Sequence, residues 1–271
     1  MIAARDTLSL APGVTVEHGR LTDAVRGDSW PLNASGAFVL ARTGDPVGLI
    51  VQELADVFSL SDEAARADVL RFAWHLNVLA LVNVESGASR SRRLADWVRL
   101  AARLAPAGAV PAAATRRRAI DTRPFRRAFG SCLAAISARV SVVAGVGTAV
   151  TAQLSLLAGA SGLIVPLTLG LGTGVGLGFH EAAHAASLRG VPSALVTRGR
   201  RTYVLHAAVS PSRRSIVALA GPLAAAGLGM GLVVAGSIVV APALAIAGCP
   251  LVAHALALTV VGGDGRVACG L

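Results

Sequence analysis

Two histidines and a glutamate stand at the spacing of a catalytic metal site. The segment Gly178–His184 reads GFHEAAH, so His180, Glu181 and His184 form the pattern HExxH. On a helix, residues i and i+4 share one face, which allows two imidazoles to bind one Zn²⁺ while the glutamate acts on a water molecule. Such a water molecule can attack a peptide carbonyl. We therefore predict that His180 and His184 are zinc ligands and that Glu181 is the catalytic base.

A catalytic zinc ion usually has three protein ligands, so one more ligand is expected. The last 150 residues contain only two acidic residues, Glu181 and Asp264. A carboxylate ligand neutralises part of the charge of Zn²⁺, and an unliganded buried carboxylate would be costly. We predict Asp264 as the third ligand of one Zn²⁺ per chain. His206 and His254 compete for this role, but His206 is more typical of an exposed loop, and His254 of an interhelical hydrogen bond.

The composition places this chemistry in a membrane. The chain has 271 residues, of which 54% are hydrophobic and 15% are charged, and its mean hydropathy is +0.65. These values exclude a disordered chain, a collagen and an ordinary soluble enzyme. Residues 140–180 and 215–263 contain no Asp, Glu, Lys or Arg. At about 1.5 Å per helical residue, each run can cross a hydrocarbon core of about 30 Å twice. We predict a polytopic membrane protein with about four transmembrane helices, near residues 140–158, 163–188, 215–240 and 243–262.

The arginines predict the orientation of these helices. All 25 basic residues are arginine. Two groups flank the membrane segments, one before the first predicted helix and one between the second and the third: Arg116, Arg117, Arg118, Arg123, Arg126 and Arg127, and Arg189, Arg198, Arg200, Arg201, Arg213 and Arg214. Because basic loops stay in the cytoplasm, both termini are expected to be cytoplasmic, with the protein in the cell membrane. Anionic lipid headgroups are a sufficient counter-charge, so no nucleic-acid partner is needed.

Residues 1–88 have the composition of a separate, soluble α+β module. They carry six arginines and eleven acidic residues, a net charge of −5. Turn and periodicity signals predict strands over 14–18, 19–25, 29–32 and 79–84 and helices over 37–41, 47–58 and 61–76, with Ser35 and Ser61 as helix caps. Strands followed by three helices describe a winged-helix-like fold. Its acidic charge argues against a DNA-binding face.

A connecting region, residues 89–130, joins this module to the membrane-embedded domain, residues 131–271. Residues 92–104 predict an amphipathic helix on the inner leaflet, and residues 106–114 a linker rich in proline and alanine. Within the membrane domain, residues 194–206 alternate in character around Gly199. They predict either a hairpin whose edge holds an extended substrate or a basic surface loop.

The membrane half resembles the site-2 protease family of membrane-embedded zinc metalloproteases. The resemblance covers residues from about 130 to 271 and rests on the HExxH helix, on Ala220-Gly221-Pro222, and on Asp264-Gly265. The resemblance implies that His180, His184 and Asp264 are the zinc ligands and that Glu181 is the catalytic base. The family often has Asn and Pro shortly before the Asp-Gly pair, whereas residues 255–261 read ALALTVV. Thr259 or His254 would then take the place of the Asn.

The N-terminal module resembles the PqqD-like recognition domains that act on ribosomally made, post-translationally modified peptides. The resemblance rests on Pro12-Gly13, Leu32-Asn33, Ala37 and Gly44-Asp45-Pro46. It implies that a leader peptide is added as a strand beside residues 28–32 and packs on the helix that follows Glu63. The implied peptide-contacting residues are Asp28, Trp30, Leu32, Leu70 and Trp74. For the two tryptophans a role in the core is the competing interpretation.

Together these features predict a membrane-embedded zinc endopeptidase that recognises a precursor peptide and removes its leader. Its expected partners are that precursor peptide and the lipid bilayer. The alternatives are regulated intramembrane proteolysis of a membrane-bound signalling protein, and a non-catalytic membrane receptor or export partner for a modified peptide.

Overall fold

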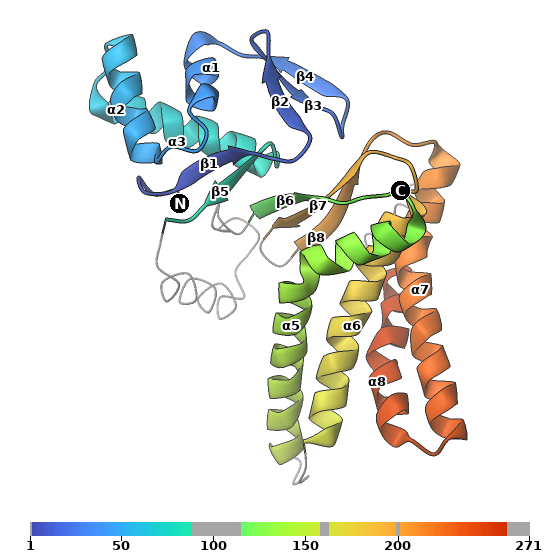
Figure 1. The fold of residues 1–271 in the computed structure, drawn as a ribbon. Coiled ribbons are helices and arrows are strands. Elements are labelled where there is room, and N and C mark those ends of the chain that lie inside the picture. Colours follow the sequence, from blue (N-terminus) through green and yellow to red (C-terminus); the bar gives the residue numbers. More distant parts are fainter. Residues whose placement is uncertain (1, 88–114, 158–162, 199–200, 259–271) are drawn as a thin grey trace. The chain divides into compact units, whose positions relative to one another are not determined.

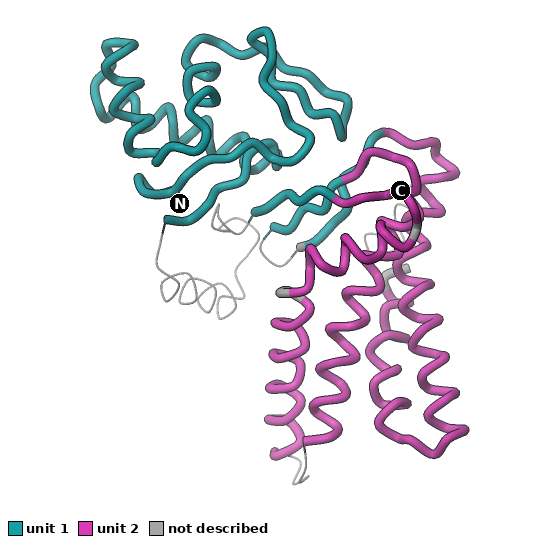
Figure 2. Tube along the Cα trace, in the orientation of Figure 1, with its two compact units in different colours: residues 1–119, 194–207 teal, residues 120–193, 208–271 magenta. Residues whose placement is uncertain are grey.

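The computed structural model describes residues 2–87, 115–157, 163–198 and 201–258 (Figure 1). Asp264, Thr259, the segment 92–104 and the linker 106–114 lie outside these residues. The chain divides into two compact units (Figure 2): residues 1–119 with 194–207, and residues 120–193 with 208–271. The coarse architecture is a β-rich N-terminal part followed by a mostly helical part.

The described residues of the first unit form three sheets and three helices. Strands β1 (Thr7–Leu10) and β5 (Val82–Glu85) pair with each other, and β2 (Val14–Glu17), β3 (Arg20–Asp23) and β4 (Asp28–Pro31) form a sheet in that order. Helices α1 (Ala34–Ala41), α2 (Val47–Phe58) and α3 (Asp62–Val78) follow β4 (Figure 1).

Helix starts in this unit follow local capping chemistry. The Ser61 side chain accepts a hydrogen bond from the N–H of Ala64 and begins α3, as predicted. Helix α1 is capped by Asn33 rather than by Ser35, because Asn33 Oδ1 accepts the N–H of Gly36 at 2.8 Å. Strand β1 was not predicted; its four residues gain their strand conformation from pairing with β5.

Strands β6 (Thr115–Ala119), β7 (Ser193–Arg198) and β8 (Arg201–His206) form the third sheet, in the order β6-β7-β8. The hairpin expected around Gly199 is therefore confirmed. Strand β6 falls within residues 89–130, which the sequence describes as a connecting region. The Asn83 side chain binds the backbone of Arg117 at two points, accepting its N–H at 2.8 Å and donating to its carbonyl at 3.0 Å. This amide thereby links β6 to β5.

A fully buried ion pair fixes β6 further. The Arg117 guanidinium donates to both carboxylate oxygens of Asp23, at 2.7 and 2.8 Å, and neither side chain is exposed. Asp23 also accepts the N–H of Val25 in the turn between β3 and β4. The charge pattern of the sequence predicts that Arg117 lies at the lipid surface with its neighbouring arginines. This prediction is wrong. The charge pattern could not reveal a partner 94 positions away.

The second unit is built on α5 (Phe125–Leu157), α6 (Ile164–Ser187), α7 (Pro211–Ile238) and α8 (Pro242–Val252), with a 3₁₀ helix η2 over Ala253–Leu258 (Figure 1). Among the described residues, two helical segments have the length and apolarity to cross a membrane, Val140–Leu157 and Pro211–Ile238, with mean hydropathies of 1.7 and 2.0. Helix α8 has only 11 residues. Four helices thus stand near their predicted positions, and two of them meet this criterion for a crossing.

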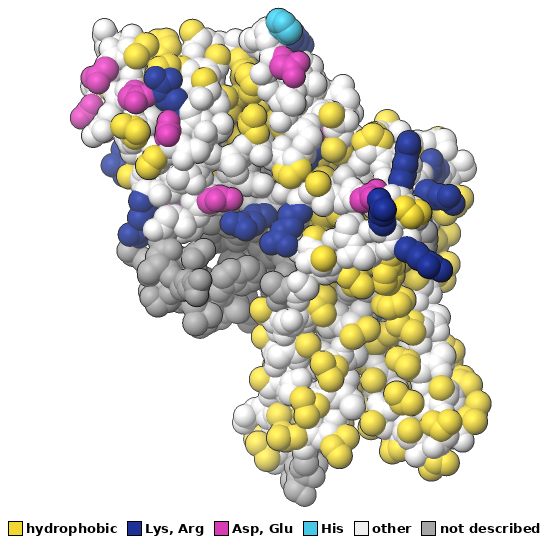
Figure 3. Space-filling view, in the orientation of Figure 1, with side chains coloured by type: hydrophobic (Ala, Val, Ile, Leu, Met, Phe, Trp, Pro, Cys, Tyr) yellow, Lys and Arg dark blue, Asp and Glu magenta, His cyan; other side chains and the backbone are white. Residues whose placement is uncertain are grey.

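The surface of this unit is strongly apolar. Only 6% of Val140–Leu157 and 33% of the window in α7 are buried within the chain. Figure 3 shows apolar side chains covering the helices of this unit. On α5 the exposed residues recur at near-helical spacing: Val142, Val146, Val150, Leu154 and Leu157. An apolar surface of this extent marks contact with lipid or with another protein.

Glycines on α6 allow its neighbours to approach closely. A Cβ added at Gly170 would lie 2.5 Å from the carbonyl oxygen of Ala144 in α5. A Cβ at Gly172 would lie 2.3 Å from the carbonyl oxygen of Ala247 in α8. Because no side chain fits at either position, α6 packs with its backbone against both helices.

The buried ion pair makes the stability of the first unit dependent on pH. Burial raises the pKa of Asp23, but the hydrogen bonds and charge of Arg117, the N–H of Val25 and the charge of Arg26 outweigh it and hold this pKa below its usual value. The ionised carboxylate is therefore favoured in the folded state. The ionised Asp23 carboxylate contributes fully to the free energy of unfolding above its unfolded-state pKa of about 4. This contribution is lost as the pH falls through the lower pKa that Asp23 has in the folded state.

We expect Asp23→Asn to destabilise the first unit by about 3–5 kcal/mol at neutral pH, because it leaves the Arg117 charge buried without its counterion. Amide hydrogen exchange of β3 and β6 in the full chain should become at least about a hundredfold faster. Asp28→Asn, which neutralises an exposed carboxylate on the next strand, is the matched control. Equal exchange in the two variants would show that the ion pair does not hold β6.

Candidate functional site

The predicted histidine pair converges near the C-terminal end of α6. The Nε2 atoms of His180 and His184 lie 3.1 Å apart, and the ring centroids are separated by 4.7 Å. His180 and Glu181 are buried, and His184 is half-buried. The helical spacing thus brings both imidazoles together next to a buried glutamate.

A hydrogen bond to α7 sets the orientation of His184. Its Nδ1 lies 2.6 Å from the carbonyl oxygen of Val217. Since a carbonyl can only accept, Nδ1 carries the hydrogen and donates it, which leaves the Nε2 lone pair facing His180. A metal-binding histidine commonly donates its other ring N–H in this way.

The geometry of the pair fits a zinc ion. Two nitrogens bound to tetrahedral Zn²⁺ at about 2.0–2.1 Å stand about 3.3 Å from each other, close to the observed 3.1 Å. The same separation also fits a hydrogen bond between the two rings. Among the described residues, no group of three His, Cys, Asp or Glu side chains is arranged around a metal position. Asp264, predicted as the third ligand, lies outside them.

A third imidazole lies beside this pair. The His254 ring, in η2, has its centroid 5.1 Å from that of His180. Space for it comes from Gly176, where a Cβ would lie 2.8 Å from His254 Nε2. The sequence offered no spacing that connects His254 with His180, because only the packing of η2 on α6 joins them. His206, the other alternative, belongs to the first unit, where its Nδ1 lies 2.7 Å from the carbonyl oxygen of Ala207.

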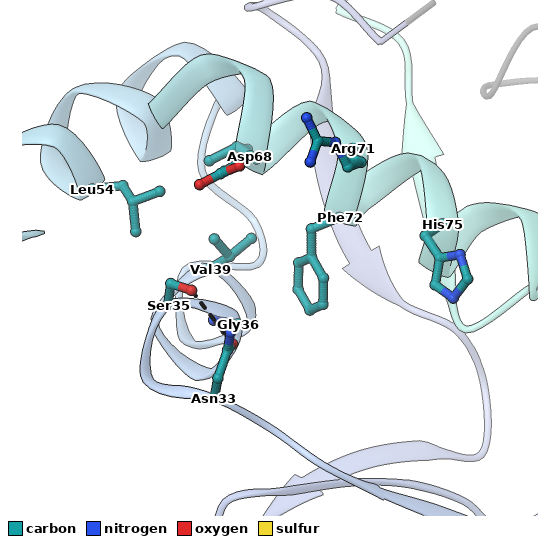
Figure 4. Close-up of a pocket in the computed structure, with 10 residues that line it drawn as sticks. Asn33, Ser35, Gly36, Val39, Leu54, Asp68, Arg71, Phe72 and His75 are labelled. Atoms are coloured by element: carbon teal, nitrogen blue, oxygen red, sulfur yellow. Dashed lines mark hydrogen bonds between the residues drawn. The ribbon is translucent and has the colours of Figure 1, made fainter. Parts of the chain in front are cut away.

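A second candidate site is a groove of about 400 Å³ between α1 and α3 in the first unit (Figure 4). Helix α3 lines it with apolar and charged side chains, and α1 with small ones. Asn33, two residues after the end of β4, also borders it. The lining residues are Asn33, Ser35, Gly36, Val39, Leu54, Asp68, Val69, Arg71, Phe72 and His75. The groove therefore combines an apolar wall with groups of both charges.

Strand β4 leads toward this groove, and its outer edge is not paired with another strand in the described residues, although Arg20 Nη2 donates to the Ser29 carbonyl at 3.2 Å. The Leu32 N–H donates to the Gly19 carbonyl at 2.8 Å, and Leu21 is paired with Trp30. Because inward and outward groups alternate along an antiparallel strand, Ser29 and Pro31 direct their backbone groups away from β3. In the described part of the chain, no further strand pairs with this side of β4. Such an edge can accept an added peptide strand.

The residues predicted to contact a peptide fall into different environments. Asp28 is exposed on β4, while Trp30 and Leu32 pack against the core around Leu21. Leu70 lines a smaller pocket of about 200 Å³ beside α2, and Trp74 is 37% exposed. Neither of these α3 residues lines the groove.

The sequence did not predict the α3 residues that line the groove: Asp68, Val69, Arg71, Phe72 and His75. They stand on a face of the helix other than that of Leu70 and Trp74. One residue in the sequence could have indicated the groove: Gly36, a glycine inside the short helix α1. A Cβ there would lie 3.2 Å from Phe72 Cζ, so the absence of a side chain lets α1 approach α3 at the groove.

One comparison with known proteins bears on this unit. Residues 19–82 match the family model described as Coenzyme PQQ synthesis protein D (PqqD). Residues 19–82 form a PqqD-like domain. It extends from just before β3 to the start of β5 and includes both the β4 edge and the groove. No curated protein and no solved structure matches the chain.

Proposed function

We propose that this protein is a membrane-embedded zinc endopeptidase that receives a precursor peptide through its PqqD-like domain and removes its leader. The leader would belong to a ribosomally made, post-translationally modified peptide. The observation that carries the catalytic part is the 3.1 Å convergence of the His180 and His184 Nε2 atoms beside the buried Glu181. The resemblance to site-2 proteases supports the same assignment.

Membrane insertion is supported by where the apolar side chains lie. Only 6% of the window in α5 is buried within the chain, whereas the core helix of a soluble domain is mostly buried. Ionisable side chains such as those of α6 are expensive within an apolar helical bundle and are functional by default. We therefore place the second unit in the cell membrane.

His180, His184 and, by the resemblance, Asp264 would hold the zinc ion. Zn²⁺ bound there would supply Lewis-acid activation of water near neutral pH. Glu181 then accepts a proton from the attacking water, whose oxygen bonds to the peptide carbonyl carbon. The same carboxyl group delivers that proton to the amide nitrogen as the C–N bond breaks. Val217 holds the His184 ring in place throughout.

The PqqD-like domain would bind the leader as an additional strand. The outward N–H of Ser29 and the outward carbonyl of Pro31 would pair with the leader backbone, while the Ser29 carbonyl already accepts from Arg20 Nη2. The groove would take the side chains of the leader. Phe72 offers an apolar contact, while Asp68, Arg71 and His75 offer charged and polar ones. Because recognition domain and protease are one chain, a bound precursor would be concentrated near the cleavage site. The PqqD match favours this assignment over cleavage of a signalling protein.

We expect Glu181→Gln to abolish proteolysis while zinc remains bound, because the amide keeps the shape but cannot accept the proton. The full chain in lipid vesicles is incubated with a proteome-derived peptide library, and new peptide N-termini are counted by mass spectrometry. Cleavage should fall at least about a hundredfold. Glu63→Gln, at an exposed position on α3, controls for the change itself. Undiminished cleavage by Glu181→Gln would contradict the mechanism, and no cleavage by the wild type would favour the non-catalytic receptor.

We expect Ser29→Pro to weaken peptide binding, because proline removes the outward N–H of β4 and leaves the backbone bonds to β3 intact. Both Ser29→Pro and Ser29→Ala lose the hydroxyl bonds to Arg20 and Thr22, so these bonds do not distinguish the two variants. The probe is a peptide selected on the wild-type full chain from a random display library. Its Kd should rise roughly threefold to tenfold, the cost of one lost hydrogen bond. Ser29→Ala keeps the N–H and should bind like the wild type. If both variants bind alike, the peptide does not use this edge.

A further inference from the structure

Helix α7 contacts His184 at two positions that lie one turn apart. The first is the hydrogen bond from His184 Nδ1 to the Val217 carbonyl, at 2.6 Å. The second is Gly221, where an added Cβ would lie 2.4 Å from Nε2, 2.7 Å from Cε1 and 2.8 Å from Cδ2 of the same ring. Because a real Cβ does not come this close to another atom, position 221 has no room for a side chain. The imidazole of His184 therefore packs against the backbone of Gly221.

The atom that needs the space at Gly221 is also the atom that faces His180. His184 Nε2 stands 3.1 Å from His180 Nε2. A methyl group at position 221 would displace the whole rigid ring, and Nε2 is the ring atom that it would approach most closely. The Val217 carbonyl meanwhile holds the hydrogen on Nδ1, so the lone pair stays on Nε2.

We propose that α7 is the positioning element of the metal site, in which Val217 fixes the His184 tautomer and Gly221 leaves the volume that Nε2 requires. Gly221 is thus a positioning residue for zinc rather than a packing residue alone. This inference rests on the proposed function, since it assigns the roles of Val217 and Gly221 in the same site.

Two other glycines of α7 separate this role from helix packing. A Cβ at Gly229 would lie 2.6 Å from the Val252 backbone nitrogen, so Gly229→Ala disturbs the packing of α7 on α8 without touching a histidine. At Gly227 nothing lies within 4 Å of an added Cβ. The three alanine variants therefore make the same chemical change in three different surroundings.

The experiment measures zinc affinity of the purified full chain in lipid nanodiscs, by competition with a chromophoric chelator. Gly221→Ala should weaken zinc binding by about tenfold to a hundredfold, the usual effect of disturbing a residue that orients a ligand. It should also change the visible absorption of the Co²⁺-loaded protein. Gly227→Ala should match the wild type, and Gly229→Ala should lower the melting temperature but keep its zinc affinity.

Equal zinc affinity in Gly221→Ala and Gly227→Ala would overturn the proposal, and so would an equal loss in Gly229→Ala. If the wild type binds zinc and Gly221→Ala binds it equally well, the proposed function stands and this inference fails. If the wild type binds no zinc, both fail together.

A measurement on the zinc-loaded wild type covers the case in which Gly221→Ala does not fold. ¹⁵N NMR of histidine-labelled protein should show the hydrogen of His184 on Nδ1, with the resonance assigned by its absence from His184→Gln. A hydrogen on Nε2 would overturn the proposal.

Discussion

The close approach of backbones around α6 is the constraint on which the helical unit depends. Gly170 admits α5, Gly172 admits α8, and Gly176 makes room for the His254 ring. From the other side, Gly221 lets α7 reach His184. With larger side chains at these positions the helices would stand further apart, and α7 and η2 would no longer reach the imidazoles of α6. The polar residues of the HExxH motif are tolerated inside an apolar bundle because their neighbours come near enough to hydrogen-bond with them, as Val217 does.

Within the first unit, the PqqD-like domain is bound to strands that come later in the sequence. Its turn residue Asp23 pairs with Arg117 of β6, and its residue Asn83 binds the β6 backbone. Strand β6 in turn pairs with β7, which follows the HExxH helix after five residues. In sequence, β7 and β8 form the connection between α6 and α7, the two helices that hold His184. The segment that joins the two helices of the metal site therefore belongs to the same compact unit as the recognition domain.

Much of the site could be derived from local rules, and the remainder depends on tertiary partners. Residue spacing on a helix was sufficient to predict that His180 and His184 converge, and a capping serine located α3. Strand β6 could not be foreseen, because its arginines resemble a basic membrane flank until Asp23 is placed against one of them. Helix α3 was predicted but its groove-lining face was not, since polar residues occur on several sides of it. The place of His254 depends on how η2 folds back on α6. The peptide-binding edge of β4 was implied by the resemblance to PqqD-like domains and not by a pattern of the residues themselves.

The central claim is that α6 holds a catalytic zinc ion, and the zinc content of the purified full chain tests it most directly. The protein is supplied with Zn²⁺, freed of excess metal, and analysed by inductively coupled plasma mass spectrometry beside His180→Ala, His184→Ala and His206→Ala. The account predicts about one zinc per chain in the wild type and in His206→Ala, and little or none in the other two variants. A folded wild type without zinc, or zinc retained in full after loss of either α6 histidine, would contradict it.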